Sequence, residues 1–225
     1  MPNSSTPSQT RIYRIVIVDD HPMVREGMNN IIRPEQDLTV CGEAEDRFQA
    51  LQVIDTKQPD LVIVDLTLKD SSGLDLIKDI QALHPLMKIL VVSMQEESHY
   101  AERVLRAGAH GYIMKQEATQ KVLLAIRQVR DCGIYISTTM ATKIAATLTG
   151  KQRAGNQASI TSLADRELQV FELIGTGYST RDIANHLHLE IKTIETYRAR
   201  IKEKLGFKDA SELLRNAIAW THRLP

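Results

Sequence analysis

The sequence predicts an α/β fold followed by a small all-α domain. Over about the first 135 residues, short apolar β-branched runs alternate with segments that have the 3.6-residue period of amphipathic helices. Two runs, Ile15–Val18 and Leu61–Val64, are continuously apolar, as strands buried on both faces of a parallel sheet are. The last third of the chain has a purely helical apolar pattern. These observations predict a (βα)5 doubly wound parallel sheet joined to a four-helix domain with a helix-turn-helix.

Strands and helices alternate regularly in the first domain. The strands are predicted at Ile12–Val18, Leu38–Cys41, Leu61–Val64, Ile89–Val92 and Tyr112–Met114. The helices are predicted at Met23–Arg33, Phe48–Lys57, Gly73–Leu83, Ser98–Ala107 and Thr119–Arg130. In such a sheet, ligands bind beyond the carboxyl ends of the strands, so that edge is where functional residues are expected.

A polar stretch separates the two domains. Residues 149–159 are rich in small and polar types and lack apolar periodicity, which is typical of a flexible linker. The preceding segment, Thr138–Leu148, is predicted to be helical and to couple the two domains. The predicted division is a polar tail at 1–11, the α/β domain at 12–133, a linker helix and linker at 134–159, and the helical domain at 160–225.

Composition and charge exclude several classes of protein. With 43% hydrophobic and 25% charged residues, the chain is expected to fold rather than to be disordered. Its formal net charge is zero, so any nucleic-acid site must be a local basic cluster. The two cysteines, Cys41 and Cys132, have no metal-ligand spacing and fit a reducing cytosol. Because no signal peptide or membrane-length apolar run is present, we expect a soluble cytoplasmic protein.

Chemically active side chains follow four of the predicted strands. The first strand ends at Asp19 and Asp20, the third at Asp65, the fourth at Ser93 and the fifth at Lys115. One such residue is commonly a solvated loop charge, but four strand ends gather at one edge of the sheet. Crowded carboxylates favour a divalent cation, and oxygen ligands favour Mg²⁺ over zinc. Asp65 is the candidate nucleophile for a phosphoryl group, and Lys115 would offset the charge of the phosphoryl oxygens.

Residues 12–133 resemble the receiver domain of two-component response regulators of the NarL/FixJ type. The motifs that carry the resemblance are Ile-Val-Asp19-Asp20-His21-Pro22, Val-Asp65-Leu, Ser-Gly73-Leu, Val-Val-Ser93-Met and Gly108-Ala-His-Gly111-Tyr112-Ile-Met-Lys115. The resemblance implies that Asp65 accepts a phosphoryl group from a sensor histidine kinase. It implies that Mg²⁺ is held by Asp19, Asp20, Asp65 and the backbone carbonyl of Thr67. Ser93 would then hydrogen-bond the phosphoryl group while Tyr112 rotates inward.

Three positions in this domain have a competing interpretation or depart from the family. Tyr112 also fits a core aromatic residue with a satisfied hydroxyl group. His21 lies beside two aspartates but is interpreted as a helix start, because Pro22 suits the first helical turn. Receivers commonly have proline four residues after the acceptor, where this chain has Lys69 followed by Asp70.

Residues 160–222 resemble the LuxR-type DNA-binding domain. The matching residues are Leu163, Arg166, Glu167, Val170, Leu173, Ile174, Gly175, Gly177, Ser179, Ile183, Ala184, Leu187, Lys192, Thr193, Ile194, Glu195, Thr196, Lys204, Leu205 and Gly206. Ser179 and Asp182 form a predicted capping box. Ala164 stands where the family often has a capping threonine, with Ser162 as a candidate substitute, and Glu190 replaces a common serine.

The segment Ile191–Lys204 carries the predicted DNA contacts. It holds five basic residues against two acidic ones, the excess that phosphate contacts require. Ile194, Ile201 and Leu205 would face the core and turn the other side of the helix toward the major groove. The residues predicted to contact DNA are Lys192, Thr193, Glu195, Thr196, Arg198, Ala199, Arg200, Lys202 and Lys204. On charge alone, a solvated charged face is the alternative.

Together the two halves predict a phosphorylation-dependent transcriptional regulator rather than an enzyme. Its expected partners are double-stranded promoter DNA, a sensor histidine kinase and a second copy of the chain on activation, with RNA polymerase as a further candidate. The homodimer is expected to use a receiver face or the final helix, unless that helix only packs on its own core. Its apolar face is formed by Leu213, Leu214, Ala217 and Ile218 beside Trp220.

Three other functions fit the sequence less well. An aspartyl-phosphate phosphatase of the haloacid-dehalogenase kind needs an acid two residues after the nucleophile, where this chain has Thr67. A module regulated by a partner or by redox state would not need the complete acidic pocket. A quorum-sensing regulator needs an aromatic ligand cavity, and only 4% of the residues are aromatic.

Overall fold

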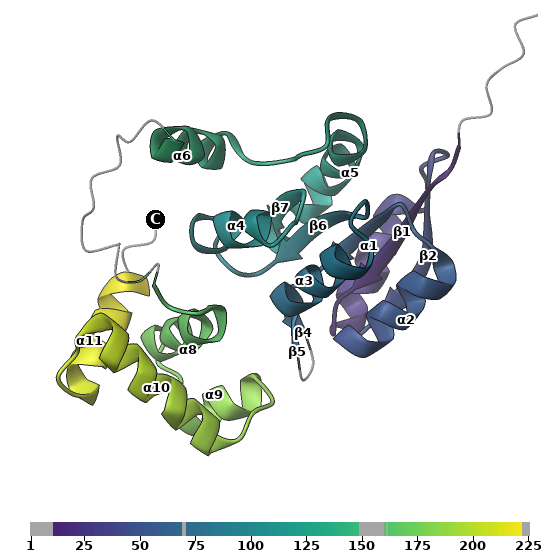
Figure 1. Ribbon diagram of the computed structural model, residues 1–225. Helices are drawn as coiled ribbons and strands as arrows, with labels where there is room; N and C mark the ends of the chain where they lie inside the picture. Colours follow the sequence, from purple (N-terminus) through teal and green to yellow (C-terminus); the bar gives the residue numbers. More distant parts are fainter. Residues whose placement is uncertain (1–10, 69–70, 149–159, 161, 222–225) are drawn as a thin grey trace, which may run out of the picture. The chain divides into compact units, whose positions relative to one another are not determined.

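The computed structural model describes residues 11–68, 71–148, 160 and 162–221 (Figure 1). Its contacts divide the chain into two compact units, Met1–Ala145 and Ala146–Pro225, each of which is described by itself. The predicted polar tail, apart from Arg11, and the predicted linker at 149–159 lie outside the described residues. None of the helices in the described part of the chain combines the length and apolar character needed to cross a membrane.

The first unit is built on a five-stranded parallel sheet in the order β2-β1-β3-β6-β7. This is the predicted doubly wound sheet, and the strand order reverses between β1 and β3. The interior strand residues are fully buried, which explains their unbroken apolar runs. The strands are β1 (Tyr13–Val18), β2 (Leu38–Ala44), β3 (Leu61–Val64), β6 (Lys88–Ser93) and β7 (Gly111–Met114).

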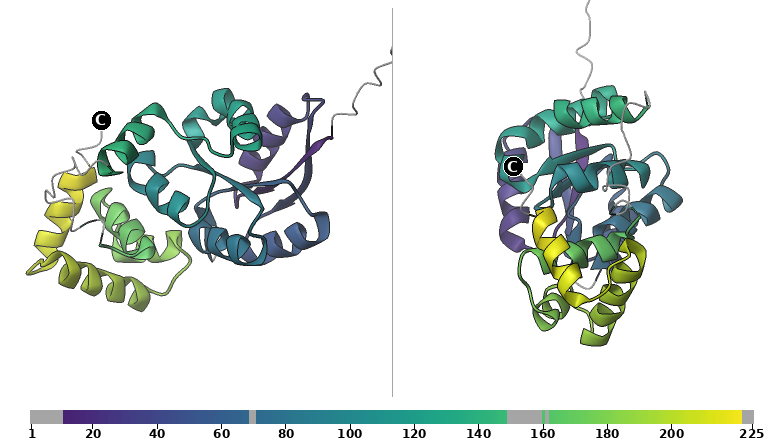
Figure 2. Two further views of the ribbon diagram at one scale, coloured as in Figure 1. Left: turned by 45° about the horizontal axis from the view of Figure 1, so that its top comes forward. Right: turned by 90° about the vertical axis from the view of Figure 1, so that its left-hand side faces the viewer.

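Five helices alternate with these strands and cover both faces of the sheet (Figures 1 and 2). Helices α1 and α5 pack together on one face, where Met28, Ile32 and Val122 join the strand side chains in one core. On the other face, α2 contacts α3, and α4 contacts the edge strand β7. The helices are α1 (Pro22–Ile32), α2 (Arg47–Lys57), α3 (Gly73–Leu83), α4 (Glu97–Arg106) and α5 (Lys115–Cys132).

A small hairpin follows β3 that the sequence did not predict. Its strands are β4 (Thr67–Leu68) and β5 (Ser71–Ser72), with Thr67 opposite Ser72. Lys69 and Asp70, where the chain departs from the common proline, lie outside the described residues.

The chain segment after α5 docks on the edge of the sheet. The Tyr135 N–H donates to the His110 carbonyl at 2.8 Å, and the Tyr112 N–H donates to the Tyr135 carbonyl at 3.3 Å. Tyr135 therefore extends the sheet beyond β7, whose edge would otherwise be open. Helix α6 (Thr138–Leu148) follows, as predicted, and its first turn is capped by Ser137, whose Oγ accepts the Met140 N–H at 3.1 Å.

The second unit is the predicted bundle of short helices. These are α8 (Asp165–Gly175), α9 (Thr180–His186), α10 (Ile191–Leu205) and α11 (Ala210–Thr221). The predicted capping box at Ser179 and Asp182 is present and starts α9. Gly175 allows α8 to approach α11 closely, since a Cβ there would lie 2.5 Å from the Ala217 carbonyl oxygen.

Candidate functional site

The predicted acidic pocket lies at the carboxyl ends of the parallel strands. Asp19 and Asp65 directly follow β1 and β3, Ser93 ends β6, and Lys115 begins α5 directly after β7. Lys115 Nζ lies 2.7 Å from Asp19 Oδ2 and 2.7 Å from Asp65 Oδ2, so one cation bridges two carboxylates. The side chains of Asp19 and Asp65 are 1% and 3% exposed, and Ser93 is fully buried beside them. The parallel topology thus brings together groups that the sequence separates by up to about a hundred residues.

Burial and charge shift the ionisation of this pocket. Burial raises the pKa of Asp65 above its ordinary value; Lys115 opposes the rise and Asp19 adds to it. Burial also acts to lower the pKa of Lys115, but Asp65 and Asp19 outweigh this effect and raise it. Lys115 therefore remains a cation, and the pocket keeps a fixed positive charge beside an Asp65 carboxylate that is costly to ionise.

Several ligand atoms for a cation converge at the pocket. Atoms of Asp19, Asp20, His21 and Asp65 all lie within 4.8 Å of one another. Among the described residues, Asp65 Oδ1 is buried without a hydrogen bond, whereas Asp20 Oδ1 has the His21 Nδ1 at 2.7 Å. Buried carboxylate oxygens without donors are costly, and a divalent cation would satisfy them. The carboxylates therefore fit the Mg²⁺ expected from sequence, and the structure adds His21, which sequence reasoning had interpreted only as a helix start.

The loop after Asp65 depends on a close approach that only glycine allows. The Gly73 N–H donates to the Leu66 carbonyl at 2.9 Å and closes the hairpin. A Cβ on Gly73 would lie 1.9 Å from the Asp65 carbonyl oxygen and 2.7 Å from Leu66 Cα. Thr67, whose carbonyl is the predicted fourth metal ligand, lies on the first strand of this hairpin. The metal role of that carbonyl stays a prediction.

Ser93 and Tyr112 are linked through one loop. The Gln95 N–H donates to Ser93 Oγ at 3.4 Å, and the Tyr112 hydroxyl donates to the Gln95 carbonyl at 2.6 Å. Tyr112 is 1% exposed, so it lies inward with its hydroxyl satisfied, as a core aromatic residue would. The hydrogen bond to the Gln95 carbonyl attaches Tyr112 to the loop that begins at Ser93, so a movement of Ser93 would also move the acceptor of this bond.

This loop leads directly to the linker helix. Glu97, at the start of α4, accepts the Ser137 hydroxyl at 2.6 Å and the Ser137 N–H at 3.3 Å. Ser137 in turn caps α6. The first turn of α6 is therefore attached to the first turn of α4, two residues beyond Gln95.

Helix α10 presents most of the predicted DNA residues to solvent. Ile194 and Ile201 are fully buried, which orients the helix as expected. Arg198 is partly buried, and this burial lowers the pKa of its guanidinium. The other outward positions divide into exposed residues (Lys192, Glu195, Thr196, Ala199, Arg200) and partly buried ones (Thr193, Lys202).

Lys204 has a partner that the sequence pattern did not indicate. Its Nζ lies 2.7 Å from Glu167 Oε2, and Glu167 is 3% exposed. The same carboxylate oxygen accepts the Ala164 N–H at 2.7 Å and caps α8, where Ala164 has no side-chain acceptor of its own. Burial acts to raise the pKa of Glu167, but Lys204 and the Ala164 N–H outweigh it and lower the pKa. Lys204 thus joins α10 to the start of α8.

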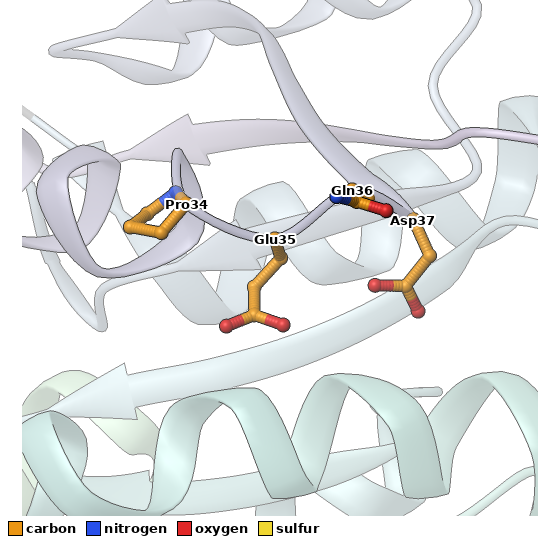
Figure 3. Close-up of a pocket in the computed structure, with 4 residues that line it drawn as sticks. All are labelled: Pro34, Glu35, Gln36 and Asp37. Carbon is orange, nitrogen blue, oxygen red and sulfur yellow. The ribbon is translucent and has the colours of Figure 1, made fainter.

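A shallow hollow lined by Pro34, Glu35, Gln36 and Asp37 lies at the other end of the sheet, before β2 (Figure 3). Arg127 of α5 pairs with Glu35 and with Asp37, the latter at 3.0 Å. Arg130 lies 2.8 Å from Asp37. These pairs lower the pKa of Asp37, so its carboxylate serves to hold α5 against the sheet.

Two family models match the chain, one in each unit. Residues 15–127 match the response regulator receiver domain. Residues 161–217 match the luxR family of bacterial regulatory proteins. The chain is 34% identical over 209 residues to the oxygen regulatory protein NreC of Staphylococcus carnosus, covering 91% of this chain and 96% of the relative.

Solved structures match along the same length. The RcsB response regulator of Salmonella typhimurium is 25% identical with a TM-score of 0.68, covering 93% of this chain and 98% of that chain. A second RcsB structure, from Salmonella enterica serovar Typhimurium, is bound to promoter DNA in the presence of the phosphomimetic BeF3⁻. It is 25% identical with a TM-score of 0.62, covering 91% of this chain and 98% of that chain.

Proposed function

Because this chain belongs to the response regulators that join a receiver domain to a LuxR-type helix-turn-helix, we propose that Asp65 accepts the phosphoryl group that controls it. The protein is a phosphorylation-dependent transcriptional regulator. The observation that carries the assignment of Asp65 is its place at the end of β3, buried and held by Lys115. The expected donor is a sensor histidine kinase of the same signalling system.

The two oxygens of Asp65 have different surroundings. Oδ2 lies 2.7 Å from Lys115 Nζ, whereas Oδ1 is buried without a hydrogen bond in the described part of the chain. One of these two oxygens attacks phosphorus, while the other stays beside the positive charges of the pocket. The new P–O bond forms as the P–N bond of a donor phosphohistidine breaks, and the histidine nitrogen keeps the electron pair. Lys115 stabilises the negative charge of the phosphoryl oxygens during transfer.

The acidic residues of the pocket fit a magnesium ion. Asp19, Asp20, Asp65 and the carbonyl of Thr67 are the ligands that would hold it. When bound, Mg²⁺ supplies positive charge to the oxygens of the transferred group. The carboxylates of Asp19 and Asp20 would otherwise repel an incoming phosphoryl donor.

Phosphorylation is expected to reach the linker through hydrogen-bonded neighbours. Ser93 bonds the phosphoryl group and draws its loop inward, which moves Gln95 and the bond that it accepts from Tyr112. Glu97 lies two residues further on and holds Ser137, so the same movement changes the attachment of α6. The coupling between phosphorylation and the second unit is proposed to run through this contact.

The second unit is proposed to read promoter DNA with α10. Lys192, Arg198 and Arg200 would contact phosphates, and Glu195 would accept a hydrogen bond from a cytosine amino group in the major groove. Thr193, Thr196, Ala199 and Lys202 complete the proposed surface. Lys204 is withdrawn from it, because its ammonium group is engaged with Glu167.

Helix α11 is proposed to support the active homodimer. Leu213 and Ala217 are fully buried in the unit's own core, whereas Leu214 and Ile218 are 42% and 37% exposed. Exposed apolar side chains one helical turn apart are suited to pairing with a second copy. A published RcsB structure contains two dimers bound to two parallel DNAs, which supports dimeric binding in the family.

Mass spectrometry after incubation with a small phosphodonor and Mg²⁺ tests the acceptor. The wild-type protein should gain one phosphate, and Asp65→Asn should gain none. Asp75→Asn is the matched control, since Asp75 is a half-exposed carboxylate on α3 in the same unit. Labelling of Asp65→Asn at the wild-type level would show that another residue is the acceptor.

A further inference from the structure

Arg25, in the first turn of α1, ties the residues that follow β1 to a neighbouring strand. Its Nη1 donates to the Asp19 backbone carbonyl at 2.6 Å, and its Nε donates to Glu43 Oε2 at 3.0 Å. Glu43 lies on β2, and the Arg25 side chain is 16% exposed. Both bonds come from one planar guanidinium group, whose donors have fixed directions. Arg25 therefore makes a backbone contact that pairing with Glu43 alone does not require.

The backbone of Asp19 is held on both sides by neighbouring residues of β2. Its N–H donates to the Ala44 carbonyl at 3.1 Å. Its carbonyl is held by Arg25, whose partner Glu43 directly precedes Ala44 on the same strand. Its carboxylate accepts the His21 N–H at 2.9 Å. Asp19 is thus the fixed point of the short connection between β1 and α1.

Asp20 is the pocket residue whose position depends on this anchor. It lies between β1 and α1, in neither element. The Asp19 carbonyl and the Asp20 N–H belong to one rigid peptide plane, so a bond that fixes the carbonyl also fixes where Asp20 begins. Mg²⁺ demands nearly ideal octahedral geometry, so its affinity depends on where the Asp20 carboxylate is held. Replacing groups that orient a metal ligand without touching the ion commonly weakens metal binding by about 10- to 100-fold.

We propose that Arg25 is a positioning residue of the acceptor pocket, which holds the Asp19–Asp20 backbone so that the Asp20 carboxylate is in place for the divalent ion. The inference rests on the proposed function, since it concerns the same pocket, and it adds a residue that touches neither the ion nor the phosphoryl group. The alternative is an ion pair that only fastens α1 to β2. A positioning residue changes the metal affinity of the folded protein, whereas such a fastening changes the unfolding temperature alone.

Electron paramagnetic resonance of free Mn²⁺, measured on the full chain without a phosphodonor, gives the dissociation constant of the ion. Arg25→Gln should raise this constant about tenfold. Arg25→Lys should raise it about threefold, because an ammonium group keeps the charge but lacks the two directed donors. Asp20→Asn should abolish tight binding, which locates the measured site in the pocket.

Arg130→Gln is the matched control. Arg130 also pairs with a carboxylate of the same unit, 2.8 Å from Asp37, but at the other end of the sheet. The Mn²⁺ dissociation constant of this variant should stay within about twofold of the wild-type value, because distant sites act independently.

Phosphorylation rates at a series of Mg²⁺ concentrations give a second readout. Arg25→Gln should raise the half-saturating Mg²⁺ concentration about tenfold and leave the rate at saturating Mg²⁺ within about twofold of the wild type, because Arg25 contacts no reacting atom. Circular dichroism establishes that each variant is folded at the assay temperature; if Arg25→Gln is not, Arg25→Lys decides. A Mn²⁺ dissociation constant within about twofold of the wild type, or an equal rise in Arg130→Gln, would overturn the inference.

The measurements separate failure of this inference from failure of the proposed function. If the wild type is phosphorylated on Asp65 while Arg25→Gln binds Mn²⁺ as the wild type does, only this inference fails. If Asp65→Asn is still phosphorylated, the proposed function fails, and a weakened Mn²⁺ affinity in Arg25→Gln would still support the positioning role of Arg25.

Discussion

Replacing Lys204 by glutamine separates two roles that a basic residue on α10 can have. As a phosphate contact, Lys204 would contribute to DNA affinity and its salt dependence. As the partner of Glu167, it stabilises the second unit by pairing a carboxylate that is 3% exposed. The structure favours the second role, because the 2.7 Å contact pairs the ammonium group with a buried carboxylate and joins α10 to α8.

The expected size follows from the burial of each partner. Breaking a fully buried ion pair costs about 3 to 5 kcal/mol, because one charge is left unpaired. The Lys204 side chain is 40% exposed, and Glu167 keeps the Ala164 N–H, so we expect a smaller loss of about 1 to 2 kcal/mol. For a domain of this size, that loss lowers the unfolding temperature by about 5 to 15 °C.

Fluorescence of Trp220 reports this loss in the full chain. Trp220 is the one tryptophan in the sequence and lies on α11, 5.6 Å from the Phe171 ring, so its signal follows unfolding of the second unit alone. Binding to duplex DNA of arbitrary sequence is measured in parallel as a function of salt. Lys204→Gln should lower the unfolding temperature and leave the salt slope of DNA binding unchanged. The control Lys192→Gln should leave the unfolding temperature unchanged and reduce the salt slope. A salt slope reduced by about 0.9 at unchanged stability would refute the assignment of Lys204.

Further predictions concern the acceptor loop, the linker, base reading and pH. Gly73→Ala should destabilise the first unit by about 3 kcal/mol in calorimetry, because the new Cβ meets fixed backbone. The control Gly27→Ala on α1 meets open space and should stabilise the unit by about 0.5 to 1 kcal/mol. Equal effects of the two substitutions would contradict this prediction. Ser137→Ala should weaken the cap of α6 by about 1 kcal/mol and reduce the difference in DNA affinity between phosphorylated and unphosphorylated protein. If this difference in affinity stays at the wild-type value, Ser137 has no coupling role. Glu195→Ala should relax preference at one base pair of each half-site in selected DNA while overall affinity holds or rises; if every position stays as selective as before, Glu195 is a bystander. Folding lowers the pKa of Glu167, so ionised Glu167 stabilises the second unit at pH values above the unfolded pKa, and this stabilisation should be lost as the pH falls below about 5. The unfolding temperature followed by Trp220 fluorescence should therefore fall with acid, and it should fall less in Lys204→Gln.

The acidic pocket could be predicted because a parallel sheet leaves little freedom in where its strands end. Continuous apolar runs located the strands, and the residue after each run was then fixed at one edge of the sheet. Asp19, Asp65, Ser93 and Lys115 meet there for that reason. The two-residue strands β4 and β5 were missed because a pair so short carries no periodic pattern.

His21 and Lys204 show where sequence patterns carry too little information. Pro22 after His21 correctly indicated a helix start, but a capping position does not determine where its imidazole points. Lys204 was predicted to contact DNA because it belongs to the basic excess of α10. Its carboxylate partner lies 37 residues earlier in the chain, so the local pattern did not indicate it. A signal was present in both cases: His21 adjoins two aspartates, and Glu167 follows a cap position without an acceptor, so its carboxylate was needed inside the domain.

DNA affinity measured with and without phosphorylation of Asp65 tests the central claim most directly. Duplex DNA is first selected from a random pool by the phosphorylated protein, and its binding is then followed by fluorescence anisotropy at one fixed salt concentration. The wild type should bind more tightly after treatment with a small phosphodonor and Mg²⁺, while Asp65→Asn should show one affinity under both conditions and Asp75→Asn should respond like the wild type. A phosphodonor response that survives in Asp65→Asn, or a phosphorylated wild type whose affinity does not change, would contradict the claim that Asp65 controls DNA binding.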